Sequence, residues 1–576
     1  MTPQDDIERE LDPRRWITLG VLVITVVLVA MDTSVLNVSI PTMLRDLDTT
    51  VPSLEWVIAG YSLTFASLLI IGGRLGDIFG HRRLFVIGVS LFGLGSLIAA
   101  LSPTVGWLIL GEAVIEGIGA ALMVPSTLAL LSSIFHGRER ATAFAAWGAA
   151  AGAAVAFGPV LGGWLTTNYS WRWAFGSNVI IAPLAVLGAM VLMSRSERHA
   201  RIPIDLPGAA LIATGMFGIV FALSQSPTYG WLTPKEALTI GSVDVWPASM
   251  PISVTAFAFV IGVVLLVAFV IVERRKEARD ASPLFEISQL RFKTFRYGLV
   301  TAVIVALGQL GLLFALPLFL QGANGLTAEE NGLWMLPLGL MMIVGAQAGG
   351  KMNHRYGTTN VVRGGFFLEA VSLVLLIITV HPGLSFWQLF PSVALFGLGV
   401  GAASGQLTNL VLSEISMEKS GVASGANSTA RQLGAALGAA MMGSLVTVQT
   451  TNHAVDSVRA AGLPAGLTDT AVKGIEAMGA NWQMPAGATP EQASALKHAF
   501  DQALTSGVRW ALAWAALLVF AGALVSLLIP QVRPVGGRIL VGDDAKAEAA
   551  RAAEARREAE VEAEAETLQP MPIETR

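Results

Sequence analysis

The chain has 576 residues, of which 53% are hydrophobic and 14% are charged, with a formal net charge of −4 and no cysteine. A soluble globular protein carries roughly 25% charged residues, so this chain has too few to cover a water-facing surface. The lack of cysteine excludes disulfides, iron–sulfur clusters and cysteine-type zinc sites. The small net charge provides no electrostatic basis for binding nucleic acid. We therefore expect a polytopic membrane protein.

Fourteen apolar stretches reach the ~20 residues that a helix needs to cross a bilayer. They are about twice as long as the ~10 residues of a membrane β-strand, and apolar and polar residues do not alternate in them. The sequence therefore predicts an all-α polytopic membrane protein. The stretches are residues 16–40, 54–75, 84–101, 105–135, 141–165, 173–193, 206–223, 252–272, 297–320, 332–350, 361–380, 386–412, 421–448 and 508–529.

Lys and Arg residues gather in the connections that follow even-numbered stretches, such as Arg82-Arg83 and Arg274-Arg275-Lys276. The positive-inside rule then predicts that both termini are cytoplasmic and that the protein lies in the cytoplasmic membrane. The polar residues Met1–Arg15 do not resemble a cleavable signal. The expected parts are a cytoplasmic N-terminus (1–15), a six-helix bundle (16–193), a linker with two extra spanning helices (194–295), a second six-helix bundle (296–530) that includes an outer loop (449–507), and a charged cytoplasmic tail (531–576).

The chain also repeats itself weakly. The segment GGRLGDIFGHRR (72–83) closes the second stretch, and GGKMNHRYG (349–357) closes the tenth. Each segment therefore follows the second stretch of a six-helix group. Two repeated halves with two extra helices between them are the simplest account, and such repeats are typical of secondary transporters.

Five short segments form recognisable motifs. They are GRLGDIFGHRR (73–83), MDTSVLNVSIP (31–41), GPVLGG (158–163), WRWAF (171–175) with Asn178, and SGVASG (420–425) followed by RQLG (431–434). The first resembles motif A of the major facilitator superfamily, and the others are similar to signatures of its drug:proton antiporters with fourteen helices. The resemblance covers about residues 16–530. It implies the major facilitator fold, with two six-helix bundles plus two central helices.

Motif A is expected to gate the cytoplasmic side through Gly73, Asp77, Gly80, Arg82 and Arg83. Asp77, at a helix end, can pair with Arg82 or Arg83, or can accept hydrogen bonds from the N-terminus of another helix. The resemblance implies that such contacts latch the two halves together when the cytoplasmic side is closed. This copy departs from the family pattern because Ile78 and His81 stand where basic residues are usual.

The antiporter motif comprises Gly158, Pro159, Gly162 and Gly163. Pro159 removes one helix hydrogen bond and is expected to bend the chain. Gly162 and Gly163 let a neighbouring backbone approach closely. The resemblance ties this kink to antiporters, and plain helix packing is the alternative.

Three carboxyl groups are expected deep in the membrane. Asp32 lies nine residues before Pro41, and Glu112 and Glu116 lie at a similar depth in the fourth stretch. At 1.5 Å per residue, all three are roughly 13–20 Å below the outer surface. In an α-helix Glu112 and Glu116 share a face. A charged carboxylate at that depth costs several kcal/mol, so each should be protonated, paired or hydrated. We predict that Asp32 with Glu112 or Glu116 forms a proton site for which a cationic or polar substrate competes.

The fourth stretch again departs from the family, whose Arg-x-x-Gln-Gly motif reads Ala113-Val114-Ile115-Glu116-Gly117 here. The usual arginine is missing, so either protons titrate at higher pH or Arg431 or another cation balances the acids. Further polar residues in apolar surroundings are candidates for a substrate cavity, with helix–helix hydrogen bonding as the alternative. They are Asn37, Gln309, Gln406, Asn409 and Arg431, with Glu369 as a further buried acid.

The sequence is best interpreted as a proton-driven antiporter that exports drugs or other amphipathic or cationic small molecules by alternating access. We expect a monomer that contacts protons, substrate and membrane lipid, and that is not an enzyme. No cofactor, metal site or nucleotide site is expected. Two alternatives remain open: a dedicated exporter of one endogenous metabolite or lipid, and a transporter-like sensor or scaffold without net transport that holds a partner through residues 543–567.

Overall fold

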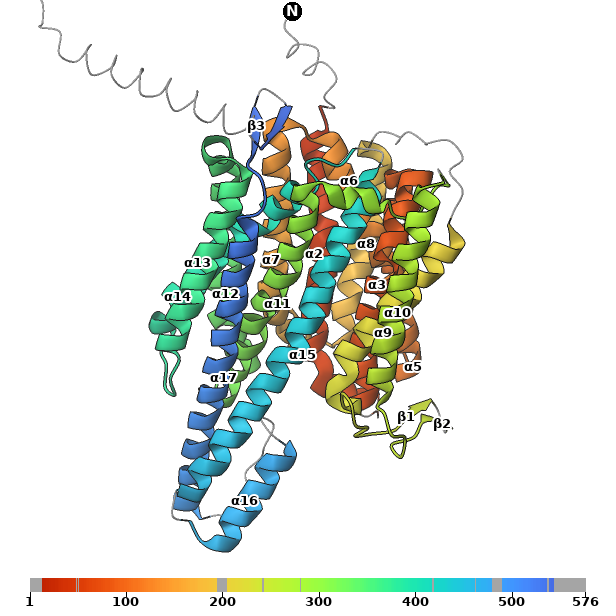
Figure 1. Ribbon diagram of the computed structural model, residues 1–576. Coiled ribbons are helices and arrows are strands. Elements are labelled where there is room, and N and C mark those ends of the chain that lie inside the picture. Colours follow the sequence, from red (N-terminus) through yellow and green to blue (C-terminus); the bar gives the residue numbers. More distant parts are fainter. Residues whose placement is uncertain are drawn as a thin grey trace, which may run out of the picture.

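The protein, seen here in a computed structural model, is a bundle of long helices that run between two faces (Figure 1). The structure describes residues 13–47, 49, 51–193, 205–240, 243–279, 281–416, 419–460, 463–478, 489–535 and 538–542. The predicted helical tail at 543–567 lies outside these residues, as do the side chains of Asn37 and Pro159. We call the end where α2 (Arg15–Asp46) begins the terminal face, because the chain also leaves the bundle there.

The remaining helices follow in chain order. They are α3 (Val51–Phe79), α4 (His81–Ala100), α5 (Val105–Leu108), the π-helix η1 (Ile109–Glu116), α6 (Gly117–Ile134), α7 (Gly137–Asn168), α8 (Arg172–Leu192), α9 (Leu206–Tyr229), α10 (Val254–Glu277), the 3-10 helix η2 (Ile287–Arg291), α11 (Lys293–Gly322), α12 (Ala328–Tyr356), α13 (Thr358–Thr379), α14 (Phe386–Val411), α15 (Ser420–Ala460), α16 (Ala465–Met478) and α17 (Pro490–Ser526). Two antiparallel hairpins pair β1 (Leu238–Ile240) with β2 (Val243–Trp246), and β3 (Val532–Val535) with β4 (Arg538–Val541).

Within the described residues, 13 helical segments are long and apolar enough to cross a membrane. They match the predicted stretches apart from the fifth, which forms α7, a 32-residue helix rich in Ala and Gly that does not meet this criterion. The predicted all-α, polytopic class is therefore confirmed, whereas the count of fourteen spans stays a prediction.

Two groups of helices make up the bundle. Helices α2 to α8 pack mainly with one another, as do α11 to α17. The groups meet along two seams, one between α3 and α15 and the other between α7 and α12. The two extra helices, α9 and α10, pack together, and α9 lies against α3 and α15 at the edge of the first seam (Figure 1). They are central in the sequence but peripheral in space.

The two groups repeat a local structure at the terminal face. Gly80 and Gly357 precede α4 and α13 with φ angles of 93° and 82°, a region that favours glycine. Just inside these helices, Arg82 donates to carbonyls in the last turn of α8, and Arg363 donates to the last carbonyl of α17 and to two carbonyls just after its end. The weak sequence repeat therefore corresponds to two copies of one arrangement.

A helical protrusion extends from the opposite face. Helix α15 has 41 residues, a length of about 61 Å against a hydrocarbon core of about 30 Å. With α16 and the start of α17 it forms the extension at the bottom of Figure 1. Its interior is apolar and includes Val455, Val458, Leu496 and Phe500. Much of the predicted outer loop 449–507 is therefore helical, because its apolar residues pack across these three helices.

Candidate functional site

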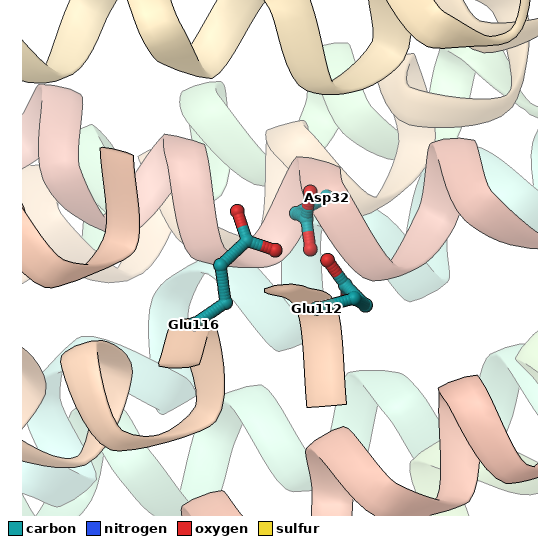
Figure 2. Close-up of side chains that lie close together, drawn as sticks. All are labelled: Asp32, Glu112 and Glu116. Carbon is teal, nitrogen blue, oxygen red and sulfur yellow. The ribbon is translucent and has the colours of Figure 1, made fainter. Parts of the chain in front are cut away.

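Three buried carboxyl groups meet inside the first helical group. Asp32 comes from α2, and Glu112 and Glu116 come from η1; Figure 2 shows their side chains converging. One oxygen atom of each lies within 4.8 Å of the others. Their exposed fractions are 5%, 1% and 0%. The structure thus brings together the three acids that the sequence analysis singled out for one site, in which Asp32 was predicted to act with Glu112 or Glu116.

The local helix geometry differs from the expectation. Residues Ile109–Glu116 form a π-helix, where an α-helix was predicted. A π-helix inserts a wider turn, and such turns are frequent at functional sites. Close contact with α4 accompanies it, because a Cβ atom on Gly111 would lie 2.7 Å from the carbonyl oxygen of Gly95. This close approach brings Glu116 against Ser96 of α4, whose hydroxyl donates to the carboxyl group.

Polar neighbours satisfy only part of the cluster. Asn178 of α8 donates from Nδ2 to Oδ1 of Asp32 at 2.9 Å. One oxygen of each acid, and the hydroxyl of the nearby buried Tyr61, have no hydrogen-bond partner among the described residues. In that part of the chain, none of the three acids forms an ion pair.

Carboxylates so close together, with no cation beside them, repel one another strongly in a medium of low dielectric constant. A hydrogen bond between two carboxyl groups requires a proton on one of them. The cluster can therefore hold and release protons. Oxygen atoms at this spacing could also hold a hard cation such as Ca²⁺, so the predicted absence of a metal stays a prediction.

Sequence reasoning did not assign a role to Asn178, Ser96 or Tyr61 in this cluster. Each is a polar side chain in an apolar stretch, which is the available signal. The sequence does not show which way these side chains point, since that depends on how α3, α4 and α8 pack.

Motif A forms a contact between the two helical groups at the terminal face. Asp77, near the end of α3, accepts hydrogen bonds from the backbone N–H groups of Gly421 and Val422 at 2.9 and 3.0 Å. These N–H groups belong to the first turn of α15, where the helix dipole favours a negative charge. His81 Nε2 lies 3.1 Å from Asp77 Oδ1. Of the two contacts expected for Asp77, the one with a helix N-terminus is therefore present.

The other motif A residues support this contact. A Cβ atom on Gly73 would collide with the carbonyl of Gly421, so glycine is needed where α3 and α15 cross. Arg82 donates to the carbonyls of Ala189 and Met190 on α8, and Arg83 is exposed. The pairing of Asp77 with Arg82 or Arg83 stays a prediction.

The antiporter motif lies in α7, which continues as helix through all four motif residues. Gly162 lets α2 approach closely, since a Cβ atom there would lie 2.9 Å from Cα of Val35. Gly158 is buried and Gly163 is half-buried. Helix α7 also forms one of the two seams with the second group. The predicted close approach at Gly162 is confirmed.

The candidate cavity residues separate into different environments. Gln406 of α14 donates to the carbonyl oxygen of Ala141 on α7 at 2.8 Å and accepts from Asn353, so it joins α14 to α7 near the terminal face. Gln309 donates to Glu369 at 3.1 Å. Asn409 is buried, with its oxygen unpartnered among the described residues. Within the part of the chain that the structure describes, Arg431 forms no ion pair with Asp32, Glu112 or Glu116.

The family follows from comparison with known proteins. A family model described as Major Facilitator Superfamily matches residues 22–439. The chain belongs to this superfamily. The human organic anion transporter MFSD10 (TETRAN), known from a crystal structure, shares the fold with a TM-score of 0.54 at 12% identity, covering 91% of this chain and 100% of that one.

Relatives among bacterial proteins are drug resistance and export proteins. A puromycin resistance protein of Streptomyces alboniger is 32% identical, over 80% of this chain and 87% of its own length. A tetracenomycin C resistance and export protein of Streptomyces glaucescens is 30% identical, over 90% and 93%. The multidrug efflux pump LfrA of Mycolicibacterium smegmatis is 29% identical, over 89% and 95%. This transporter is therefore a multi-pass membrane protein of the superfamily, with drug-export relatives.

Proposed function

We propose that this transporter exports drugs or other amphipathic small molecules across the cytoplasmic membrane in exchange for protons. The observation that carries the proposal is the cluster of Asp32, Glu112 and Glu116, three buried carboxyl groups whose oxygen atoms lie within 4.8 Å of one another. Protons are the ions that such a cluster is best suited to exchange, because the three acids are buried and form no ion pair among the described residues.

In this proposal the terminal face is cytoplasmic, as the distribution of Lys and Arg predicts. Asp77 of α3, which contacts α15, and Gln406 of α14, which contacts α7, then hold the two helical groups together on the cytoplasmic side. The three acids take up protons from outside. Protonation removes their mutual repulsion, the two seams open on the cytoplasmic side, and a substrate enters as protons leave. Rocking of the two helical groups about the site completes the cycle.

The test is dye transport in everted membrane vesicles. Rhodamine 6G, a permanently charged cation, should accumulate in vesicles that carry the protein when a proton gradient is imposed, and a protonophore should abolish the accumulation. The variant Asp32→Asn keeps the shape of the side chain but cannot take up a proton. It should lose gradient-driven accumulation and retain exchange of labelled for unlabelled dye.

The matched control is Glu236→Gln, which removes an exposed acid outside the helices and should transport normally. Undiminished gradient-driven transport by Asp32→Asn would overturn the proton assignment. Transport of one compound from a broad panel would favour the dedicated exporter instead.

A further inference from the structure

A groove opens on the outside of the second helical group, between α13 and α17. It has a volume of about 410 Å³, within the range of about 300–1,000 Å³ that is usual for ligand pockets. Ala370 of α13 and Ala516 of α17 form its floor, with exposed fractions of 8% and 9%. Larger apolar side chains form its walls, and they are 49–63% exposed: Phe367, Val374, Leu517 and Phe520. The groove exists because two small residues lie between large ones.

The groove faces the hydrocarbon of the membrane. Ala370 is twelve residues from the start of α13, which places the groove about 18 Å from the terminal end of this helix. Helix α17 runs along the surface of the bundle (Figure 1). At this depth an exposed apolar groove is filled by hydrocarbon chains.

A cation lies at the end of the groove away from the terminal face. Arg509 is exposed, and it is seven residues before Ala516 on the same side of α17, about 10 Å away along the helix. It forms no ion pair among the described residues, and the nearest acid along α17, Asp501, pairs with Lys497. Trp510 beside it is 49% exposed, as expected of an aromatic anchor at the membrane interface.

The hydrogen bonds of Arg509 leave one edge of its guanidinium available. Nε and Nη2 both donate to the carbonyl oxygen of Val380, just past the end of α13, at 3.0 and 2.6 Å. Nη1 has no partner among the described residues. Since a guanidinium has five N–H donors, both hydrogens of Nη1 and one of Nη2 can still donate. Two parallel N–H groups on one edge match the oxygens of a phosphate.

Arg363 lies at the terminal end of the same pair of helices and differs in this respect. Its Nε and Nη2 donate to the carbonyls of Ser526, Leu527 and Ile529, and its Nη1 donates to Asn360. Every nitrogen of this guanidinium therefore already has a partner. The arginine with a free edge is Arg509, so the cation that complements the groove is the one at the face opposite the terminal face.

We propose that the groove between α13 and α17 binds a phospholipid with a net negative charge. Its phosphate lies on the free edge of Arg509, and one acyl chain lies over Ala516 and Ala370. An anionic headgroup is preferred because it balances Arg509, whereas a zwitterionic headgroup brings a competing cation. The inference does not depend on the proposed export function.

Quenching of a fluorescent label by brominated lipid tests this at the groove itself. The chain has no cysteine, so Leu517→Cys on the groove wall can be labelled with bimane without background. The full-length protein is placed in nanodiscs with equal amounts of phosphatidylglycerol and phosphatidylcholine, and one of the two lipids is brominated at a time. Brominated phosphatidylglycerol should be enriched at the label by about fivefold, the effect of one arginine near an anionic lipid.

The control label is Ile180→Cys on α8, which is 58% exposed and lies about 12 Å from the same face of the bundle. There the two lipids should quench equally. In the Leu517→Cys background, Arg509→Gln should abolish the preference for phosphatidylglycerol, and Arg509→Lys should keep part of it, because it retains the charge without the planar fork. Lys473→Gln, at an exposed lysine on α16, should keep all of it. Ala516→Phe fills the floor and should lower quenching by both lipids.

Three results would overturn the inference. The first is equal quenching by the two lipids at Leu517→Cys. The second is an unchanged preference for phosphatidylglycerol in Arg509→Gln. The third is weak quenching by either lipid together with a dimeric protein in the nanodiscs, which would show that a second copy of the chain covers the groove.

Discussion

The contact of Asp77 with α15 allows a quantitative prediction for Asp77→Asn. The carboxylate accepts two backbone hydrogen bonds, from Gly421 and Val422. A hydrogen bond to a charged group contributes about 1.5–3 kcal/mol. Asparagine keeps one acceptor oxygen but has no charge to interact with the helix dipole, so the closed state should lose about 2–4 kcal/mol. At 1.4 kcal/mol per tenfold, the equilibrium shifts toward opening by about 30- to 700-fold.

The assay is pulsed electron spin resonance between two spin labels on opposite groups. The chain has no cysteine, so Arg83→Cys on α4 and Lys351→Cys on α12 supply two exposed attachment sites near the terminal face without background labelling. A population that is about 99% closed becomes only about three-quarters closed after a 30-fold shift. Asp77→Asn should therefore add a longer distance to the distribution.

Asp46→Asn is the matched control, because it removes the same charge at the other end of α2, where Asp46 accepts from the indole of Trp171. It should leave the distribution unchanged. An unaltered distribution in Asp77→Asn would refute the reasoning, since it would show that the two backbone hydrogen bonds do not stabilise closure.

Three further predictions concern single positions. Arg363→Ala should lower the thermal unfolding midpoint in detergent, because it removes the donor to the carbonyls of Ser526, Leu527 and Ile529 at the end of α17 and just after it; an unchanged midpoint would contradict this. Gly162→Leu should reduce transport and stability together, because its side chain would displace Val35 of α2, and normal transport would show that the helices can move apart at no cost. Gln406→Ala removes the bond to the carbonyl of Ala141 and should weaken the contact between α7 and α14, which spin-label distances would show, while leaving rhodamine 6G affinity within about twofold, since a neutral hydrogen bond contributes about 0.5–1.5 kcal/mol to closure. A large loss of rhodamine 6G affinity would instead indicate that Gln406 lines the substrate cavity.

Much of the architecture could be predicted because membrane insertion depends on local properties. A run of about 20 apolar residues is sufficient to predict a helix in lipid, and the stretches agree with the structure almost everywhere. The exception is α7, whose many Ala and Gly residues make it less apolar. Gly80 of motif A and Gly357 of the repeated segment could also be predicted as glycines, since both need a φ angle that other residues avoid.

The site was less predictable because its geometry depends on packing between distant segments. Asp32 and Glu116 were chosen from the cost of burying an acid, but Ser96 and Asn178 come into contact with them only through the packing of α4 and α8. The π-helix at Ile109–Glu116 has no evident signal in its apolar sequence. Gln406 and Gln309 look alike in sequence, yet one joins α14 to α7 and the other contacts Glu369.

The sequence by itself determined that this is a helical membrane protein of a transporter family, that acids are buried in its first half, and that glycines permit close helix crossings. These properties follow from hydrophobicity, the cost of burying charge and backbone sterics, which act residue by residue. Only the tertiary structure decided which charges meet. It gathered Asp32, Glu112 and Glu116 in one half, with no ion pair to any of them among the described residues, and placed Gln309 beside Glu369 in the other. The physical reason is that a Coulomb interaction depends on distance in space, and the packing of the helices sets that distance.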